Sequence, residues 1–288
     1  MSDKFLPKFC SIQDYLMLDL ETKHGTPITS DECKQVCSMI FEDPKYDDQF
    51  LYWSTKNDGP SGGKITVDVL GVQVPIDEGM TGKHARLVRC VATRPDIPLE
   101  ANFYHAECAA EKTKWDPIST TAKVIVDDIA GCDVMYGNFK VPFFTEREYI
   151  VYRRCHQVNN DKFYMLQRSA VHPKIDAVKP NKDCVWSETF LIAECYERVG
   201  EGVRLSIAVL NDPGGSMPRA AFTAFAAMAV RQVCQSCGQV ARKAVKDGFL
   251  PYAQWWFKER VQKGSGENAI AKLTPPSDVK VPLGWISA

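Results

Sequence analysis

One long segment near the C-terminus repeats apolar residues at helical spacing. Ser216 is the predicted N-cap of this helix, Pro218 lies in its first turn, and Gly248 ends it. Arg and Lys side chains take the other faces, so the pattern predicts an amphipathic helix that covers an apolar surface. The apolar stripe consists of Phe222, Phe225, Ala226, Ala229, Val233, Cys237, Val240 and Ala244.

Most of the remaining chain has strand character. The segments are rich in β-branched and aromatic residues and are bounded by Gly, Pro or Asp. Two helices are expected among them, at 30–43 with a capping pattern that starts at Ser30, and at 99–114 before Pro117. The predicted strands are 49–55, 64–71, 83–93, 120–129, 132–141, 147–157, 161–171, 184–197 and 203–210.

About nine strands with two embedded helices exclude a parallel doubly wound sheet, because that fold needs a helix after nearly every strand. The pattern predicts an α+β fold with one curved antiparallel sheet. Strand 203–210 runs directly into the turn that opens the long helix, so we expect this helix to lie across the sheet as a lid over a cavity. The expected parts are an N-terminal extension with a helix (1–43), the sheet-and-lid domain (44–247) and an aromatic, Pro/Gly-containing tail (248–288).

Composition narrows the class to an ordinary globular protein. The chain has 288 residues, 45% of them hydrophobic, and its formal net charge of -1 gives no support to binding of nucleic acid. No apolar run approaches the roughly 20 residues that a membrane span needs, and the charged N-terminal segment is unlike a signal peptide. A cytoplasmic chain is the expectation. The 11 cysteines are an odd number at wide spacing, which predicts buried free thiols.

Other motifs that could indicate catalysis or metal binding have simpler explanations. Cys234 and Cys237 have metal-site spacing, but they lie inside the long helix with no second pair, so packing is the better interpretation. A Gly-Gly-Lys sequence at 62–64 is followed by a strand rather than by the helix of a phosphate loop. The five histidines show no ligand spacing, and there is no nucleophile-elbow motif. We therefore expect no catalytic residue, no metal and no cofactor.

Several short motifs occur in a fixed order over roughly residues 44–247. In this order and spacing they resemble the START (steroidogenic acute regulatory protein-related lipid transfer) domain, and among those domains the phosphatidylcholine transfer protein group. The resemblance implies a helix-grip fold that holds one lipid in a tunnel, with the last helix and a neighbouring loop as the gate. The motifs are Lys114-Trp115-Asp116, Lys140-Val141-Pro142-Phe143, Arg147-Glu148-Tyr149 and Asn211-Asp212-Pro213-Gly214-Gly215.

The resemblance also implies a headgroup site that this chain keeps only in part. Lys112 falls where the phosphatidylcholine carrier has a phosphate-binding arginine, so the positive charge is retained without the bidentate geometry. Three positions of its aromatic cage hold Tyr149, Gly137 and Leu191, and a glutamine position falls at about Ala193. One ring of three does not make a cage for choline. A different headgroup, or a ligand with none, is expected.

The cholesterol-carrying members suggest a competing hypothesis. Arg153 falls at their buried arginine, and strand alternation places it on the same face as Tyr149. Asp133 shares its face with Phe139 and is the candidate acidic partner of Arg153. Such a buried pair would orient a hydroxyl or a headgroup. The alternative is a surface arginine and an aspartate at a strand end.

The sequence thus predicts a non-enzymatic carrier of one lipid, with a phospholipid preferred over a sterol because of the closer resemblance to the phosphatidylcholine transfer protein group and because of Lys112. Phe222 and Phe225 are the expected lipid contacts on the lid helix. A lipid sensor or scaffold, and an enzyme that uses Asp133, Tyr149 and Arg153, are the alternatives. The expected partners are the lipid and, transiently, a membrane, and the chain is expected to be a monomer.

Aromatic and basic residues are concentrated just beyond the lid helix, in the segment 255–260. This composition is typical of a membrane interface. Because Glu259 interrupts the positive charge and the segment is short, packing of the rings onto the domain is the preferred interpretation.

Overall fold

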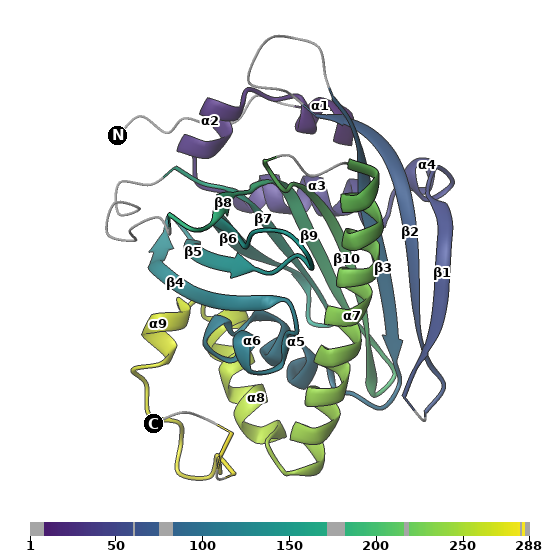
Figure 1. The fold of residues 1–288 in the computed structure, drawn as a ribbon. Helices are drawn as coiled ribbons and strands as arrows, with labels where there is room; N and C mark the ends of the chain where they lie inside the picture. Colours follow the sequence, from purple (N-terminus) through teal and green to yellow (C-terminus); the bar gives the residue numbers. More distant parts are fainter. Residues whose placement is uncertain are drawn as a thin grey trace.

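The computed structural model describes residues 9–59, 61–74, 83–171, 182–215, 219–282 and 284–285. Within these residues, a large curved sheet has helices on both of its faces (Figure 1). The N-terminal helices cover one face. The long helix α7 (Arg219–Lys246) crosses the other.

Ten strands form this sheet in the described part of the chain, in the order β1-β2-β3-β10-β9-β7-β6-β5-β4, with β8 paired to β6. All neighbours are antiparallel except β6 and β8, which are parallel. The predicted α+β class and the antiparallel sheet are therefore confirmed. The strands are β1 (Leu51–Asp58), β2 (Gly63–Val74), β3 (Lys83–Arg94), β4 (Ser119–Ile129), β5 (Cys132–Phe139), β6 (Arg147–Asn159), β7 (Lys162–Ser169), β8 (Val185–Trp186), β9 (Glu188–Val199) and β10 (Gly202–Asp212).

The helices confirm the sequence pattern with local corrections. The expected helix at 99–114 is two helices, because the backbone is extended at Cys108. The N-cap of α3 is Thr29 rather than Ser30, since the Thr29 side chain accepts a hydrogen bond from the Glu32 amide. The predicted cap Ser216 and Pro218 lie outside the described residues. The shorter helices are α1 (Ile12–Leu16), α2 (Leu20–Gly25), α3 (Ser30–Phe41), α4 (Pro44–Asp47), α5 (Leu99–Glu107), α6 (Ala109–Trp115), α8 (Leu250–Phe257), the π-helix η2 (Lys258–Gln262) and α9 (Glu267–Ile270).

Side chains of the central strands alternate between two apolar layers, because successive residues of a strand point to opposite faces. On β9, Leu191 and Ala193 pack in the layer that includes the N-terminal helices. Tyr196 packs in the other layer, with α5, α7 and α8. Both faces of the sheet are therefore covered at β9, whereas the edge strand β1 is largely exposed.

A buried guanidinium ties α7 to the sheet. Arg94, at the end of β3, donates to Asp58 at 2.6 Å, to Asn102 at 2.7 Å and to the carbonyl oxygen of Cys234 in the middle of α7. A Cβ atom at position 238 would lie 2.7 Å from Arg94 Nε, so Gly238 permits this close approach. The C-terminal half of α7 is thereby anchored.

We predict that Asp58→Ala destabilises the protein by about 3–5 kcal/mol, because it leaves the fully buried Arg94 charge unpaired. Urea denaturation measures the change. Asp161→Ala is the control, since Asp161 pairs with Arg198 on the surface and its loss should cost no more than about 1 kcal/mol. Equal losses for the two variants would contradict the anchoring role.

Candidate functional site

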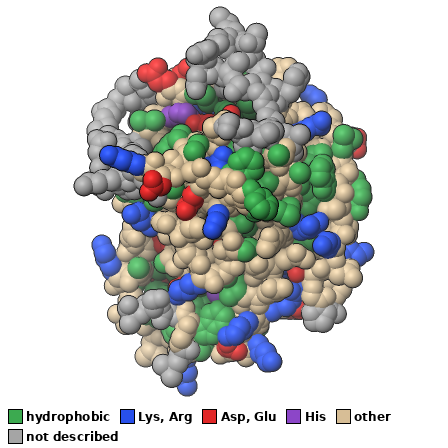
Figure 2. Space-filling model, in the orientation of Figure 1, with side chains coloured by type: hydrophobic (Ala, Val, Ile, Leu, Met, Phe, Trp, Pro, Cys, Tyr) green, Lys and Arg blue, Asp and Glu red, His purple; other side chains and the backbone are tan. Residues whose placement is uncertain are grey.

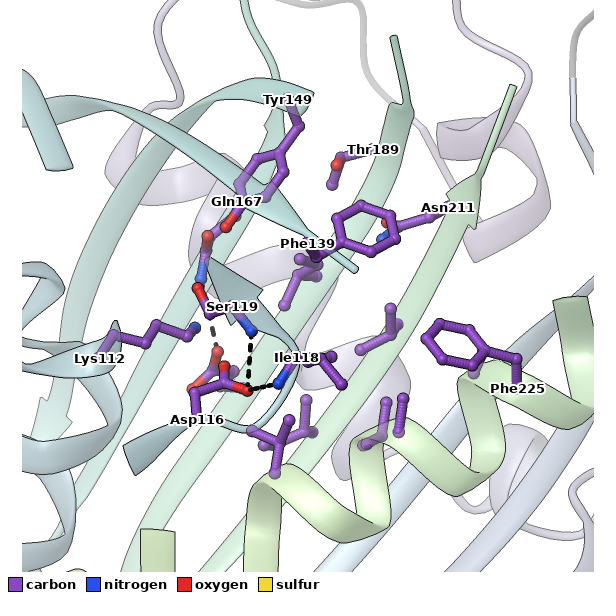
Figure 3. A pocket seen from close by; sticks show the side chains of 18 of the residues that line it. Lys112, Asp116, Ile118, Ser119, Phe139, Tyr149, Gln167, Thr189, Asn211 and Phe225 are labelled. Atoms are coloured by element: carbon purple, nitrogen blue, oxygen red, sulfur yellow. Dashed lines mark hydrogen bonds between the residues drawn. The ribbon is translucent and has the colours of Figure 1, made fainter. Parts of the chain in front are cut away.

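A cavity of about 150 Å³ lies between the sheet and the N-terminal half of α7 (Figure 3). Its apolar lining comes from the sheet, from the start of β4 and from one side of α7: Ile118, Phe139, Ile192, Ile207, Val209, Phe222, Phe225, Ala226, Ala229, Val230 and Val233. Its polar lining comes from α6 and the sheet side: Lys112, Asp116, Ser119, Tyr149, Gln167, Thr189, Glu194 and Asn211. The cavity is therefore amphipathic.

Lys112 supplies the positive charge of the lining. Its ammonium group points toward Ser119 and Asp116 (Figure 3), and it forms no hydrogen bond or ion pair with any residue that the structure describes. Burial lowers the pKa of Lys112, but its electrostatic neighbours, Tyr149 and Asp116 foremost, raise it by more. The net shift is upward, so Lys112 remains charged at neutral pH.

Two buried oxygens in the lining have no hydrogen-bond partner among the described residues. They are Ser119 Oγ and Asn211 Oδ1. An unsatisfied buried polar atom costs roughly 1–3 kcal/mol, so such atoms indicate the place where a ligand or a water molecule binds. Asp116 positions Ser119, because Asp116 Oδ1 accepts from the amides of Ile118 at 3.0 Å and Ser119 at 3.3 Å.

At the inner end of the cavity, two buried carboxyl groups share one tyrosine. Tyr196 Oη lies 2.5 Å from Glu107 Oε1 and is also hydrogen-bonded to Glu194. A hydroxyl has one proton to donate, so one of the two carboxyl groups must carry a proton of its own. Burial and the nearby Glu107 raise the pKa of Glu194 well above the ordinary value of 4.5. Glu194 is therefore the group that stays neutral.

Gly137 and Tyr149 shape the outer end. A Cβ atom at Gly137 would lie only 2.4 Å from Tyr149 Oη, so the glycine lets the tyrosine ring lie against the backbone of β5. Gly137 does not itself line the cavity, and the nearest other ring is that of Phe139, 6.1 Å from Tyr149 between centroids. Two rings side by side do not enclose a quaternary ammonium group.

Five of the predicted site residues line this cavity: Lys112, Phe139, Tyr149, Phe222 and Phe225. Leu191 and Ala193 do not, because their side chains point into the layer of the N-terminal helices. Ile192 and Glu194 take their places, one residue further along β9. The predicted residues and the lining residues differ by one position along β9, and one position turns a strand side chain to the opposite face.

Asp133 and Arg153 form the predicted pair, at 2.8 Å, but they lie outside the cavity lining. Both are 1% exposed, so the surface alternative is wrong. Two residues of the C-terminal segment complete the cluster: Arg260 pairs with Asp133, and Glu267 pairs with Arg153 at 2.9 Å. Although burial raises the pKa of Asp133, Arg260 and Arg153 lower it by more. The cluster therefore fixes the C-terminal segment rather than facing the cavity.

The sequence interpretation missed Gln167, Glu194 and Asn211. Gln167 and Glu194 interact across β7 and β9, with a nitrogen-to-oxygen distance of 3.4 Å. Asn211 begins a motif that supports the turn and the START resemblance, but it was not predicted to contact a ligand. Polar residues within otherwise apolar strands were the available signal for all three.

Comparison with known proteins identifies the fold. No protein-family model and no curated protein sequence matches the chain. The crystal structure of human STARD10 is similar with a TM-score of 0.62 and 15% identity, over 85% of this chain and 96% of that one. Human StAR-related lipid transfer protein 5 is similar with a TM-score of 0.61 and 14% identity, over 75% of this chain and 96% of that one. The chain thus has the START helix-grip fold, an antiparallel sheet gripped by a long C-terminal helix.

Two further observations concern chemistry and membranes. In the described part of the chain, no group of three or more His, Cys, Asp or Glu side chains is arranged to hold a metal ion. None of the described helices combines the length and the apolar character that crossing a bilayer requires.

We predict that the stability of the wild-type protein falls, relative to that of Glu194→Gln, as the pH rises above about 4.5. A raised pKa means that the folded protein holds a proton that the unfolded chain releases. The stabilisation is complete below the unfolded pKa and is lost as the pH rises through the folded pKa, by at most about 1.4 kcal/mol per pH unit. Urea titrations across this range measure it. Glu197→Gln, on the same strand and a third exposed, should leave the pH dependence as in the wild type.

Proposed function

We propose that the chain is a non-enzymatic lipid carrier that binds one amphipathic lipid under α7. The apolar body of the lipid would lie against Phe222 and Phe225, and its polar group would lie near Lys112, Ser119 and Asn211. The observation that carries this proposal is an amphipathic cavity whose polar side holds one cation and two buried oxygens that have no partner among the described residues. One of the similar structures described above is named a lipid transfer protein, which supports the same class of function.

The size of the cavity requires that α7 move. A volume of about 150 Å³ is similar to that of an engineered cavity that holds benzene. A lipid that buries several hundred Å² gains on the order of 10 kcal/mol at about 25 cal/mol per Å², enough to offset displacement of part of a helix. The C-terminal half of α7 is anchored by Arg94, so we assign the movement to the N-terminal half, which acts as the gate.

We propose transient contact with a membrane at the open side of the cavity, by a chain that is cytoplasmic and monomeric. Phe143 is fully exposed in the loop between β5 and β6, and Phe144 in the same loop is partly exposed. Figure 2 shows hydrophobic side chains gathered on the face that carries α7. Aromatic side chains of this kind favour the interface between water and lipid.

Within this class we favour a phospholipid over a sterol, because an unpaired lysine suits a phosphate oxygen. Native mass spectrometry of the protein purified from cells, followed by lipid extraction, tests this preference. A bound sterol without any phosphorus-containing lipid would refute it. Transfer between donor and acceptor vesicles distinguishes a carrier from a sensor, since a sensor would bind lipid and move it slowly.

We predict that Lys112→Ala weakens binding of a fluorescent short-chain lysophosphatidylcholine by roughly 10- to 100-fold, because the variant loses one charge-assisted hydrogen bond to the phosphate. Lys112→Arg should retain most of the binding, because it keeps the charge. Lys114→Ala is the matched control, since Lys114 is half-exposed and pairs with Glu111. Undiminished binding by Lys112→Ala would remove Lys112 from the headgroup site.

We predict that Ala229→Trp abolishes lipid binding, because Ala229 is 4% exposed and lines the cavity. Met228→Trp is the control for the same change on the exposed side of α7 and should bind lipid as the wild type does. Lipid per protein, measured by native mass spectrometry, is the readout, and circular dichroism verifies that both variants fold. Full loading of a folded Ala229→Trp variant would place the lipid elsewhere.

A further inference from the structure

The face of the sheet that carries the cavity continues beyond it. On β7, Gln167 lines the cavity, and Met165 and Phe163 point to the same side further along the strand. On β9, Tyr196 follows Glu194 in the same way. These further positions lie in a filled apolar layer rather than in a cavity. The concave face of the sheet is therefore covered by packed side chains near Phe163 and Tyr196, and it borders the cavity near Gln167 and Glu194.

The filling comes partly from the segment that follows α7. The ring of Phe257, at the end of α8, contacts Phe163 of the sheet with a centroid distance of 4.9 Å and Phe103 of α5 at 5.1 Å. Phe103 in turn contacts Tyr196 at 4.9 Å. Since the Tyr196 hydroxyl bonds to Glu194, a continuous row of rings connects α8 to the inner end of the cavity.

The same segment is fixed to the sheet by charges. Asp133 and Arg153, on neighbouring strands, hold Arg260 and Glu267 in the buried cluster described above. Further on, the Asp127 carboxylate on β4 accepts hydrogen bonds from the amides of Asn268 at 3.1 Å and Ala269 at 2.6 Å. The segment therefore contacts three strands through directional bonds, and it cannot slide along the hollow without breaking them.

We propose that residues 249–270 are a fixed plug, and that Phe257 sets the depth of the cavity and so restricts the ligand to a lipid with a single short acyl chain. This inference rests on the proposed function. Movement of the N-terminal half of α7 widens the cavity from the side, but the row of rings closes its inner end. Two acyl chains or a steroid nucleus need more space there than the plug leaves.

The test uses the full chain and a defined lipid mixture. The wild type and its variants are incubated with equimolar lysophosphatidylcholines from decanoyl to stearoyl, together with dioleoylphosphatidylcholine and cholesterol, and native mass spectrometry records which lipids are retained. Phe257→Ala removes the ring at the end of the row. Tyr252→Ala is the matched control, because Tyr252 lies on the same helix and packs on Tyr104 and Trp255 rather than on the sheet.

The wild type should retain the shorter single-chain lipids, and Phe257→Ala should shift retention to longer chains, with roughly a fourfold gain in binding for each additional buried methylene. Tyr252→Ala should keep the wild-type profile. Ile207→Phe changes the depth of the cavity from within the cavity itself. It provides a second test if Phe257→Ala does not fold. Ile207 lines the cavity opposite Glu194 in the β9–β10 register, so the larger ring should shift retention to shorter chains.

Two outcomes would overturn the plug. One is a wild type that retains dioleoylphosphatidylcholine or cholesterol in preference to the single-chain lipids, and this outcome leaves the proposed carrier function intact. The other is an unchanged chain-length profile in Ile207→Phe and in a folded Phe257→Ala variant. If the wild type retains no lipid of any kind, the proposed function fails and the inference fails with it.

Discussion

The charge of Arg94 has to be neutralised inside the protein, and that constraint organises the rest of the structure. Its partners come from β1, α5 and the middle of α7, so a single guanidinium connects the edge of the sheet, a capping helix and the long helix. Arg242, on the next turns of α7, adds a second link to Asp58 and to Asp96. One half of α7 is thereby part of the rigid core, and the other half is held mainly by apolar contacts around the cavity. A helix with one fixed half and one weakly held half is suited to open without unfolding.

The architecture could be predicted from the sequence because periodicity is a local signal. Strand character in nine segments with few intervening helices leaves an antiparallel sheet as the solution, and the stripe from Phe222 to Ala244 requires a surface to cover. It could not be predicted in the same way which side chains of β9 point to which face of the sheet. The run Leu191-Ile192-Ala193 is apolar at every position, because the sheet is covered on both sides, so alternation carries no information there. A difference of one residue along β9 was then enough to separate the predicted side chains from those that line the cavity.

The C-terminal segment shows a different limit of sequence reasoning. Its aromatic and basic composition suits a membrane surface and a protein interior equally well, and the choice depends on partners far away in the chain. The ring of Phe257 packs on Phe103 and Phe163. Arg260 pairs with Asp133, and Glu267 pairs with Arg153. The Arg153–Asp133 pair itself could be inferred from parity and from a family resemblance. That the pair serves to hold Arg260 and Glu267 could not, because no local pattern connects residues more than a hundred positions apart.

The order in which the chain is synthesised determines when the buried charge cluster can form. The segment with Arg260 and Glu267 leaves the ribosome after the ten described strands and after α7, so during most of translation Asp133 and Arg153 lack these two partners, and Arg153 has only Asp133 and Glu107 in the cluster. The nascent sheet therefore has a hollow that is open at the end which α8 later closes. Completion of the domain waits for residues 249–270 to dock, and until then the rings of Phe163 and Tyr196 are exposed to chaperones and to other nascent chains.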